Sequence, residues 1–230
     1  AVFFVLKNIR EGKKMKTALL QYITEKKYDN RYAEKLRGYF ANLYKEEDLF
    51  HNHDEKGKSQ YRMPLIQYKV INGMLSIVGI EEGAKLIADE FLKHKRIPLE
   101  SERGIEYLEN FEVNLIVKEE EFCVNDELYS YKFDSIWLAL NEENHKKYIK
   151  EESIDLDKIL IGNILSNFKG CDIKIEKKIM VKGNYKPIEV MMKNNKMIGF
   201  TGNFVTNVKM PDYISIGKRR AIGYGVIKSV

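Results

Sequence analysis

The sequence predicts an α+β protein made of two tandem ferredoxin-like domains, the second of them degenerate and ending in a glycine-rich loop. The chain has 230 residues, a length that suits one large domain or two small ones. Apolar residues make up 44% and charged residues 32%, which excludes disordered and low-complexity chains. The order of the predicted elements favours two domains, because both halves open with a strand followed by a helix.

The first predicted elements are a strand and an amphipathic helix. The apolar run Met15–Thr24 indicates the strand, and residues 1–14 before it are interpreted as an upstream segment or an added edge strand. From Arg31 to about Lys45, apolar residues recur at three- and four-residue spacing, which is typical of a helix with one buried face. The expected buried face consists of Ala33, Leu36, Tyr39, Phe40 and Leu43.

A β-hairpin, a second helix and a fourth strand complete the first predicted domain. Tyr61–Ile71 and Met74–Ile80 are joined by Asn72-Gly73, the strongest short-range signal for a hairpin turn. Glu81–Lys93 opens with acidic residues and closes with basic ones, as the helix dipole favours. Leu108–Lys118 alternates apolar and polar residues and indicates the fourth strand. The result is the β-α-β-β-α-β order of a ferredoxin-like domain.

The second half begins in the same way and then departs from the pattern. Tyr129–Leu140 indicates a strand, and two helices are predicted over Glu142–Lys150 and Leu156–Phe168. The acidic residues from Glu119 to Asp126 are the expected junction, so the two domains are predicted over residues 15–122 and 123–230. The remaining predicted elements are β-rich and lie at Asp172–Val181, Ile188–Met192, Met197–Val208 and Tyr213–Val230.

Charge is distributed unevenly along the chain. The formal net charge is +5, made up of +6 over residues 1–98, −11 over residues 99–157 and +10 over residues 158–230. A polyanion would therefore meet cationic surface at the two ends of the sequence, and nucleic acid is the commonest partner of such a surface. Ordinary solvated faces explain the same charges equally well.

Other features narrow the class of protein. Cys123 and Cys171 stand in no C-x-x-C or zinc-binding spacing, so neither a disulfide framework nor a metal site is indicated. The apolar run Ala1–Leu6 has no basic segment before it and is far too short to span a membrane. A protein of the reducing cytoplasm, with no membrane partner, is expected.

The densest chemical signal is the segment Phe50–Asp54, in which His51 and His53 are one residue apart. Imidazoles titrate near neutral pH, so the pair suits acid–base cleavage of an RNA phosphodiester without metal. One would remove the 2′-hydroxyl proton, and the other would protonate the departing 5′-oxygen. Two further interpretations stay open: metal ligands, with Asp54 adding an oxygen, or a solvated polar loop. Tyr61 is a candidate hydrogen-bond donor to a phosphate, or simply the first residue of a strand.

A second signal is the glycine-rich segment, residues 216–225, where glycines surround three consecutive cations. Glycine lets the backbone approach a phosphate closely and leaves N–H groups free, and guanidinium groups bind phosphate oxygens. The order matches neither a P-loop nor a dinucleotide fingerprint, so no nucleotide cofactor is expected. A long hairpin turn with exposed basic residues is the alternative. The candidate residues are Gly217, Lys218, Arg219, Arg220, Gly223 and Gly225.

Several stretches together resemble the CRISPR-associated repeat-processing endoribonucleases of the glycine-rich-loop superfamily, closest to the branch found with type I-B systems. The resemblance covers roughly residues 15–230. Ile136 and Ser215 depart from the family's usual proline and glycine, and Ser215 is expected to stiffen the terminal loop. The stretches are LRGYFAN (36–42), HNH (51–53), PLIQYKVING (64–73), YKFDSIWLALNEEN (131–144) and the glycine-rich run over residues 199–225.

The resemblance implies two ferredoxin-like domains side by side, with RNA held across their common face. It also implies metal-independent cleavage of the repeat in precursor CRISPR RNA, leaving a 2′,3′-cyclic phosphate and a 5′-hydroxyl, with no cofactor. The role of catalytic histidines then falls on His51 and His53, and that of the active-site tyrosine on Tyr61. Arg37 and Lys45 join the glycine-rich segment as expected RNA-binding residues.

Two rival functions remain. A non-catalytic RNA-binding subunit of a CRISPR effector complex would share the fold, although the histidine pair argues against it. A metal-dependent nuclease would lose its activity in EDTA. The expected partner is the repeat of precursor CRISPR RNA, with other effector-complex subunits and a second copy of the chain as further candidates.

Overall fold

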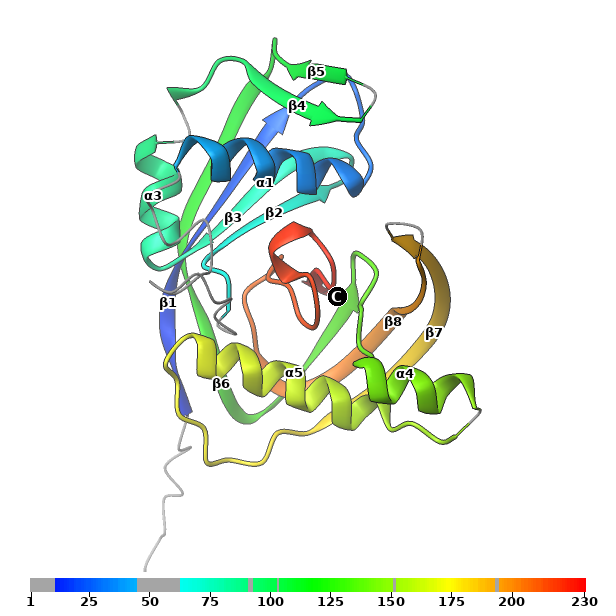
Figure 1. The fold of residues 1–230 in the computed structure, drawn as a ribbon. Helices are drawn as coiled ribbons and strands as arrows, with labels where there is room; N and C mark the ends of the chain where they lie inside the picture. Colours follow the sequence, from blue (N-terminus) through cyan, green and yellow to red (C-terminus); the bar gives the residue numbers. More distant parts are fainter. Residues whose placement is uncertain (1–10, 45–62, 91–92, 103, 151, 193–194) are drawn as a thin grey trace, which may run out of the picture.

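The computed structural model describes residues 11–44, 63–90, 93–102, 104–150, 152–192 and 195–230. Within these residues, the main sheet has seven strands in the order β2-β3-β1-β6-β8-β7, with β9 paired to β6, and β4 and β5 form a separate two-stranded sheet (Figure 1). The predicted α+β class is confirmed. The elements are β1 (Glu11–Ile23), α1 (Arg31–Leu43), β2 (Ile66–Ile71), β3 (Met74–Ile80), α3 (Glu82–Glu90), β4 (Ile97–Ser101), β5 (Gly104–Leu108), β6 (Glu112–Phe133), α4 (Glu142–Ile149), α5 (Leu156–Gly170), β7 (Val181–Met192), β8 (Asn195–Lys209), the 3₁₀ turn η2 (Arg220–Ile222) and β9 (Ile227–Ser229).

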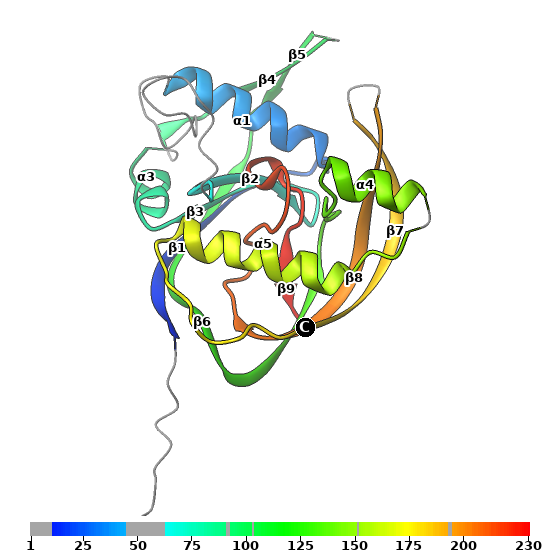
Figure 2. The same ribbon diagram turned by 60° about the horizontal axis from the view of Figure 1, so that its bottom comes forward.

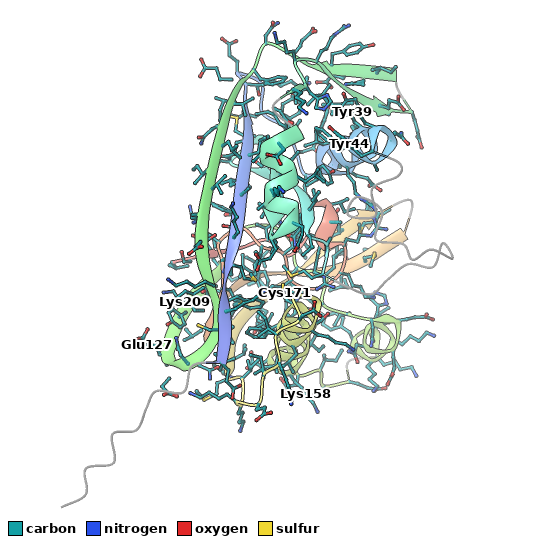
Figure 3. All side chains as sticks on the ribbon, turned by 90° about the vertical axis from the view of Figure 1, so that its left-hand side faces the viewer. Tyr39, Tyr44, Glu127, Lys158, Cys171 and Lys209 are labelled. Carbon is teal, nitrogen blue, oxygen red and sulfur yellow. The ribbon has the colours of Figure 1, made fainter. Side chains whose placement is uncertain are left out.

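The first half of the chain has the predicted ferredoxin-like order. β2 pairs with β3, β3 with β1, and β1 with β6, all antiparallel. Asn72 and Gly73, in the predicted hairpin turn, both have positive φ angles, 52° and 77°, as a two-residue type I′ turn requires. α1 and α3 lie on the same side of these strands (Figures 1 and 3).

Helix α1 confirms most of the predicted buried face. Ala33, Leu36 and Phe40 are buried, but Leu43 is 48% exposed and Tyr39 is only half-buried. A helix turns by about 100° per residue, which rotates Tyr39 and Leu43 furthest from the line of the three buried side chains. The buried face of α1 is therefore narrower than the sequence predicted.

A hairpin of β4 and β5 lies between α3 and β6, where no element was predicted. Its inner side chains Ile97, Leu99 and Leu108 are fully buried and belong to the same hydrophobic cluster as α1. The strand predicted to start at Leu108 was wrong at its beginning, because Leu108 belongs to β5. Asn110 follows with a φ of 54°, and β6 begins only at Glu112.

Strand β6 runs through the acidic residues that were predicted as a junction. Glu119 and Glu121 face Lys16 and Lys14 of β1 across the ladder. Opposite charges that face each other across an antiparallel pair favour the pairing, so the acidic run continues the strand. β1 correspondingly begins earlier than predicted, at Glu11. The far end of β6 pairs with β8 and β9, so one strand serves both halves of the molecule.

Helices α4 and α5 confirm the two helices predicted after this strand. Each begins at a side-chain cap: the Asn141 side-chain oxygen accepts the N–H of Asn144 at 2.7 Å, and the Asp155 carboxylate accepts that of Lys158 at 3.0 Å. None of the described helices, these two included, is long and apolar enough to cross a membrane.

The segment between α5 and β7 is irregular, although a strand was predicted over Asp172–Val181. The Glu11 carboxylate accepts the backbone N–H groups of Glu176 and Lys177, both at 2.7 Å, so these groups donate outside any strand ladder. The two hydrogen bonds hold the pKa of Glu11 below its ordinary value. At the end of the chain, the predicted run Tyr213–Val230 contributes only the turn η2 and the short strand β9.

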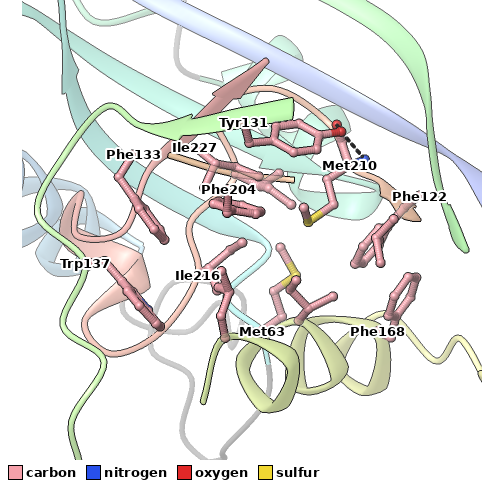
Figure 4. Packing of buried hydrophobic residues seen from close by; sticks show 14 of the residues in the cluster. Met63, Phe122, Tyr131, Phe133, Trp137, Phe168, Phe204, Met210, Ile216 and Ile227 are labelled. Atoms are coloured by element: carbon pink, nitrogen blue, oxygen red, sulfur yellow. Dashed lines mark hydrogen bonds between the residues drawn. The ribbon is translucent and has the colours of Figure 1, made fainter. Parts of the chain in front are cut away.

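Two hydrophobic clusters fill the two halves of the molecule. The first lies beneath α1, against β1, β2 and β3. The second surrounds α5 and includes Met63, Trp137 and Ile216 (Figure 4). In it, Phe122 of β6 and Phe168 of α5 stack with their ring centroids 3.9 Å apart. The second cluster therefore joins β6, α5 and the glycine-rich segment.

Candidate nucleic-acid interface

The predicted catalytic residues lie outside the residues that the structure describes. His51, His53 and Tyr61 fall within residues 45–62, and so does the predicted RNA-binding residue Lys45. Their roles therefore stay predictions. The glycine-rich segment and Arg37 are described, and they define the candidate interface.

The described residues on either side of this gap belong to different hydrophobic clusters. Tyr44 is the C-cap of α1, its N–H donates to the Phe40 carbonyl at 3.0 Å, and it packs against the first cluster. Met63 is fully buried in the second cluster, where a Cβ on Gly170 of α5 would lie 2.5 Å from its side chain. Residues 44 and 63 are thus anchored in opposite halves of the molecule.

The glycines of the glycine-rich segment are required by close contacts within the protein. Gly223 and Gly225 have φ angles of 80° and 65°. A Cβ on Gly225 would lie 1.9 Å from the Ile216 carbonyl oxygen, and one on Gly223 would lie 2.6 Å from the Asn30 side-chain oxygen. The N–H of Gly225 donates to the Ile136 carbonyl at 2.8 Å. This N–H group is therefore not free for a phosphate, contrary to the sequence argument.

Gly217 is held against the second cluster in the same manner. Its φ angle is 91°, and a Cβ there would lie 2.7 Å from the indole nitrogen of Trp137. The next N–H, that of Lys218, donates to the Leu138 carbonyl at 3.1 Å. The backbone of the segment is thus fixed before any ligand arrives.

The three consecutive cations of the segment face different environments. Lys218 and Arg219 are exposed to solvent, and Arg219 has a left-handed backbone with a φ of 55°. Arg220 is turned inward, and its guanidinium donates to the side-chain oxygen of Asn167 on α5. Burial lowers the pKa of Arg220 from its ordinary value. Of these three cations, only Lys218 and Arg219 are exposed and could be reached by a phosphate group.

Arg37 lies on the helix that packs beside this segment. It is half-buried on α1 and interacts electrostatically with Tyr68 of β2. The turn η2 contacts both β2 and α1, and Figure 2 shows it between these elements and α5. The structure therefore brings the predicted RNA-binding helix of the first half next to the glycine-rich segment of the second.

A buried polar network, formed by Gln67, Lys69, Asn167 and Ser215, fastens the glycine-rich segment to β2 and α5. Lys69 donates to the Gln67 side-chain oxygen at 2.8 Å and to the Ser215 hydroxyl. The Ser215 N–H donates to Gln67 at 3.1 Å, and the Asn167 amide donates to the Ser215 carbonyl at 3.0 Å. All four side chains are fully buried. Ser215, which departs from the family's glycine, holds the segment through these contacts.

No role was predicted from the sequence for Gln67, Lys69 or Asn167, and Lys69 is the charged member of this network. No carboxylate among the described residues pairs with it, and burial lowers its pKa well below the ordinary value. The available signal was a lysine inside the apolar run IQYKVI, a strand that is buried along nearly its whole length. A charged residue in such a run points to a special environment.

Replacing Lys69 by methionine should change how stability depends on pH. The ordinary lysine pKa is 10.5, and burial depresses it in the folded protein. Between the depressed value and pH 10.5 the unfolded chain binds the extra proton, so the free energy of unfolding rises with pH by up to about 1.4 kcal/mol per unit. The methionine variant should lack this slope, and urea unfolding over that range measures the difference.

The control for this prediction is Lys158→Met, an exposed lysine on α5 (Figure 3). It should leave the pH dependence of unfolding unchanged. If the difference in unfolding free energy between wild type and Lys69→Met were the same at every pH, Lys69 would not titrate at a depressed pKa.

Replacing both Lys218 and Arg219 by alanine should weaken RNA binding mainly at low salt. Each contact with a single-stranded phosphate contributes about 0.7 to the slope of log affinity against log salt, so the slope should flatten by about 1.4. Binding titrations of cognate and scrambled RNA over a range of salt concentrations test this, and the loss should be similar for both.

The matched control is the alanine pair at Lys146 and Lys147, which are neighbouring cations on α4. These lysines already pair with Glu142 and Glu143 at 2.9 and 2.7 Å, so the control should change the slope less. An unchanged slope in the Lys218 and Arg219 variant would show that the glycine-rich segment is only a solvated turn.

Comparison with solved structures identifies the class of protein that has this fold. Cas6 from Thermus thermophilus superposes with a TM-score of 0.54 at 10% sequence identity, covering 95% of this chain and 99% of that chain. Identity this low shows the fold alone. The chain therefore has the tandem ferredoxin-like fold of Cas6 proteins.

Family-level comparisons are more specific. Models of the Cas6b N-terminal and C-terminal domains match residues 13–115 and 123–230. A crystal structure of Cas6b superposes with a TM-score of 0.85, and one of the CRISPR RNA processing endoribonuclease Cas6b with 0.73; each is 31% identical, over 95% of this chain and 100% of that chain. An uncharacterized protein of Methanocaldococcus jannaschii is 43% identical over 117 residues, which are 48% of this chain and 79% of that protein. The chain belongs to the Cas6b family, which confirms the resemblance found in the sequence.

Proposed function

We propose that this protein is an endoribonuclease that cleaves the repeat of precursor CRISPR RNA. The observation that carries the proposal is its membership of the Cas6b family, since it matches a CRISPR RNA processing endoribonuclease along 95% of its length. The exposed cations of the glycine-rich segment, next to the helix of Arg37, support an RNA ligand.

The proposed cleavage uses the RNA's own 2′-hydroxyl as the nucleophile. One of His51 and His53 removes the 2′-hydroxyl proton, and the oxygen attacks the adjacent phosphorus. The other histidine protonates the 5′-oxygen as its bond to phosphorus breaks. Tyr61 stabilises the crowded negative charge of the transition state. The products are a 2′,3′-cyclic phosphate and a 5′-hydroxyl, and no metal ion takes part.

Incubation of end-labelled repeat RNA with the purified protein in EDTA tests the proposal. Cleavage in EDTA, at one position within the repeat, is expected, with a cyclic phosphate on the upstream fragment by mass spectrometry. Binding without cleavage at any metal concentration would identify a non-catalytic RNA-binding subunit. Cleavage that disappears in EDTA and returns with added Mg²⁺ or Mn²⁺ would identify a metal-dependent nuclease.

A further inference from the structure

A groove of about 750 Å³ lies between helix α1 and the β4–β5 hairpin, and the proposed function makes no use of it. Helix α1 contacts β4 and also the turn η2 of the glycine-rich segment. Figure 1 shows α1 between the hairpin and η2. The groove and the glycine-rich segment are therefore on opposite sides of this helix.

The groove has the length of a short extended peptide. Its helical wall extends from Arg31 to Asn42, which at 1.5 Å per residue is about 16 Å. An extended chain covers this distance in about five residues. The opposite wall includes Pro98 and Ile105 of the hairpin, and the Ile105 side chain is 55% exposed. An apolar side chain of a ligand would find contact there.

Gly38 lies in the interior of α1 and lines the groove. Its φ angle is not positive, and a Cβ at this position would meet no heavy atom within 4 Å. Glycine in a helix interior is destabilising relative to alanine. Gly223 and Gly225 are required by contacts within the protein, whereas no described contact requires Gly38. The open space above Gly38 lets the main chain of a ligand approach the helix closely.

Carboxylates outnumber cations among the described residues that line the groove. The two cations, Arg31 and Lys35, are already engaged within the protein. The Arg31 guanidinium donates to the Asp29 carboxylate at 2.7 and 3.0 Å, and the Lys35 ammonium lies 3.9 Å from the centre of the Tyr32 ring. Both are therefore poorly placed to attract an anion. The carboxylates are those of Glu34, Glu100, Glu102 and Glu106.

Three of these four carboxylates have no partner among the described residues. Glu106 accepts from the Lys26 ammonium and, at 2.8 Å, from the Tyr32 hydroxyl. The other three are exposed and form no hydrogen bond or ion pair with a described residue. Unpaired carboxylates repel phosphate and attract ammonium and guanidinium groups. The groove is therefore complementary to a basic ligand and unfavourable to RNA.

We propose that this groove binds an extended basic peptide segment of a partner protein. The segment has about five residues, with lysine or arginine on either side of an apolar residue. Its basic side chains pair with the three free glutamates, its apolar side chain contacts Ile105, and its main chain passes over Gly38. The inference does not depend on the proposed function, because RNA at the glycine-rich segment would lie across α1 from the peptide.

A synthetic peptide tests the proposal on the purified full-length protein. The probe is a fluorescein-labelled nonapeptide whose central leucine has two lysines on each side, in a background of glycine and serine. Fluorescence anisotropy should show saturable binding to wild type. The same peptide with glutamates in place of the lysines should not bind. No saturable binding of the lysine peptide, or equal binding of the two peptides, would overturn the proposal.

Gly38→Leu fills the groove from the helical side. The new side chain enters open space, so the protein should fold normally while peptide affinity falls by about 10-fold or more. The matched control is Gly162→Leu on α5, where a Cβ also meets nothing within 4 Å and which lies outside the groove. It should bind the peptide as wild type does. Equal affinities for both variants would overturn the proposal.

Gly38→Ala checks the argument about the glycine itself. Alanine is the better helix former, so this variant should unfold at a higher urea concentration than wild type. A lower urea midpoint would show that the protein requires glycine here for its own packing, and would overturn the argument that the space serves a ligand.

Charge reversal at the rim tests the complementarity. Glu100→Lys removes one attractive pair and adds a repulsion, so affinity for the lysine peptide should fall by about five-fold. The control is Glu152→Lys, at an exposed carboxylate that does not line the groove. It should stay within two-fold of wild type. Equal losses in both variants would show that the peptide binds by overall charge and not in the groove.

RNA binding distinguishes the groove from the RNA path. Gly38→Leu should bind repeat RNA within two-fold of wild type. If it weakened RNA binding as strongly as peptide binding, the groove would belong to the RNA path and the proposal would be overturned. If wild type bound the peptide but cleaved no repeat RNA, the proposed function would fail and the peptide site would stand.

Discussion

Replacing His53 by alanine should slow single-turnover cleavage of repeat RNA by about 10²- to 10⁴-fold, the usual worth of a general acid or base. RNA affinity should stay within a few-fold of wild type, because the imidazole acts on protons that move only in the transition state. His51→Ala should cost as much or less. The measurement is the cleavage rate of labelled repeat RNA at saturating enzyme.

The pH profile of wild type supplies a second check. Two histidines that react in opposite protonation states should give a bell-shaped rate profile, with limbs between about pH 5 and pH 8. His145→Ala is the control, since this half-buried histidine lies on α4 and no role in cleavage is assigned to it. If His51→Ala and His53→Ala both cleaved at the wild-type rate, the catalytic groups would lie elsewhere in the chain.

Replacing Trp137 by alanine should have the largest effect on stability, about 3–5 kcal/mol in the free energy of unfolding. The side chain is fully buried, stacks on Phe133 at 5.1 Å between centroids, and donates its indole N–H to Asn163 at 3.1 Å. Gly217 packs against the indole of Trp137. The cavity left by the alanine substitution should therefore also loosen the glycine-rich segment and weaken RNA binding. Urea unfolding and RNA titration at low temperature measure the two effects.

The control for Trp137→Ala is Ile149→Ala, a large apolar side chain on α4 that is 65% exposed. It should change the free energy of unfolding by no more than about 0.5 kcal/mol. A loss of less than about 1 kcal/mol for Trp137→Ala would show that the cluster around it repacks and does not fix the glycine-rich segment.

Elements with strong local signals were predictable from the sequence. The hairpin turn at Asn72-Gly73, the amphipathic α1 and the capped helices α4 and α5 each depend on residues close together in the chain. The β4–β5 hairpin was missed because each strand has only five residues, and only Ile97, Leu99 and Leu108 are buried, in the cluster beneath α1. Its stability comes from tertiary packing, which short-range patterns do not contain.

The candidate interface was predictable in composition but not in orientation. The sequence identified three adjacent cations as equivalent, whereas Arg220 turns inward to Asn167, a residue 53 positions earlier in the chain. The same limit applies to Lys69, whose partner Ser215 is 146 positions away. Contacts over such separations follow from the topology of the sheet, and a single sequence does not encode them in any local pattern.

The continuous strand β6 sets the order in which this chain can fold during synthesis. Thr17 of β1 pairs with Lys118, a residue 101 positions later, so the edge of β1 that faces β6 stays unpaired until that residue has been translated. The far end of β6 pairs with β9 only after Ile227–Ser229 have also been translated. Contacts this distant close slowly, and until they close both strands present unpaired edges that attract other chains. Nascent and truncated forms should therefore depend on chaperones far more than the finished protein does.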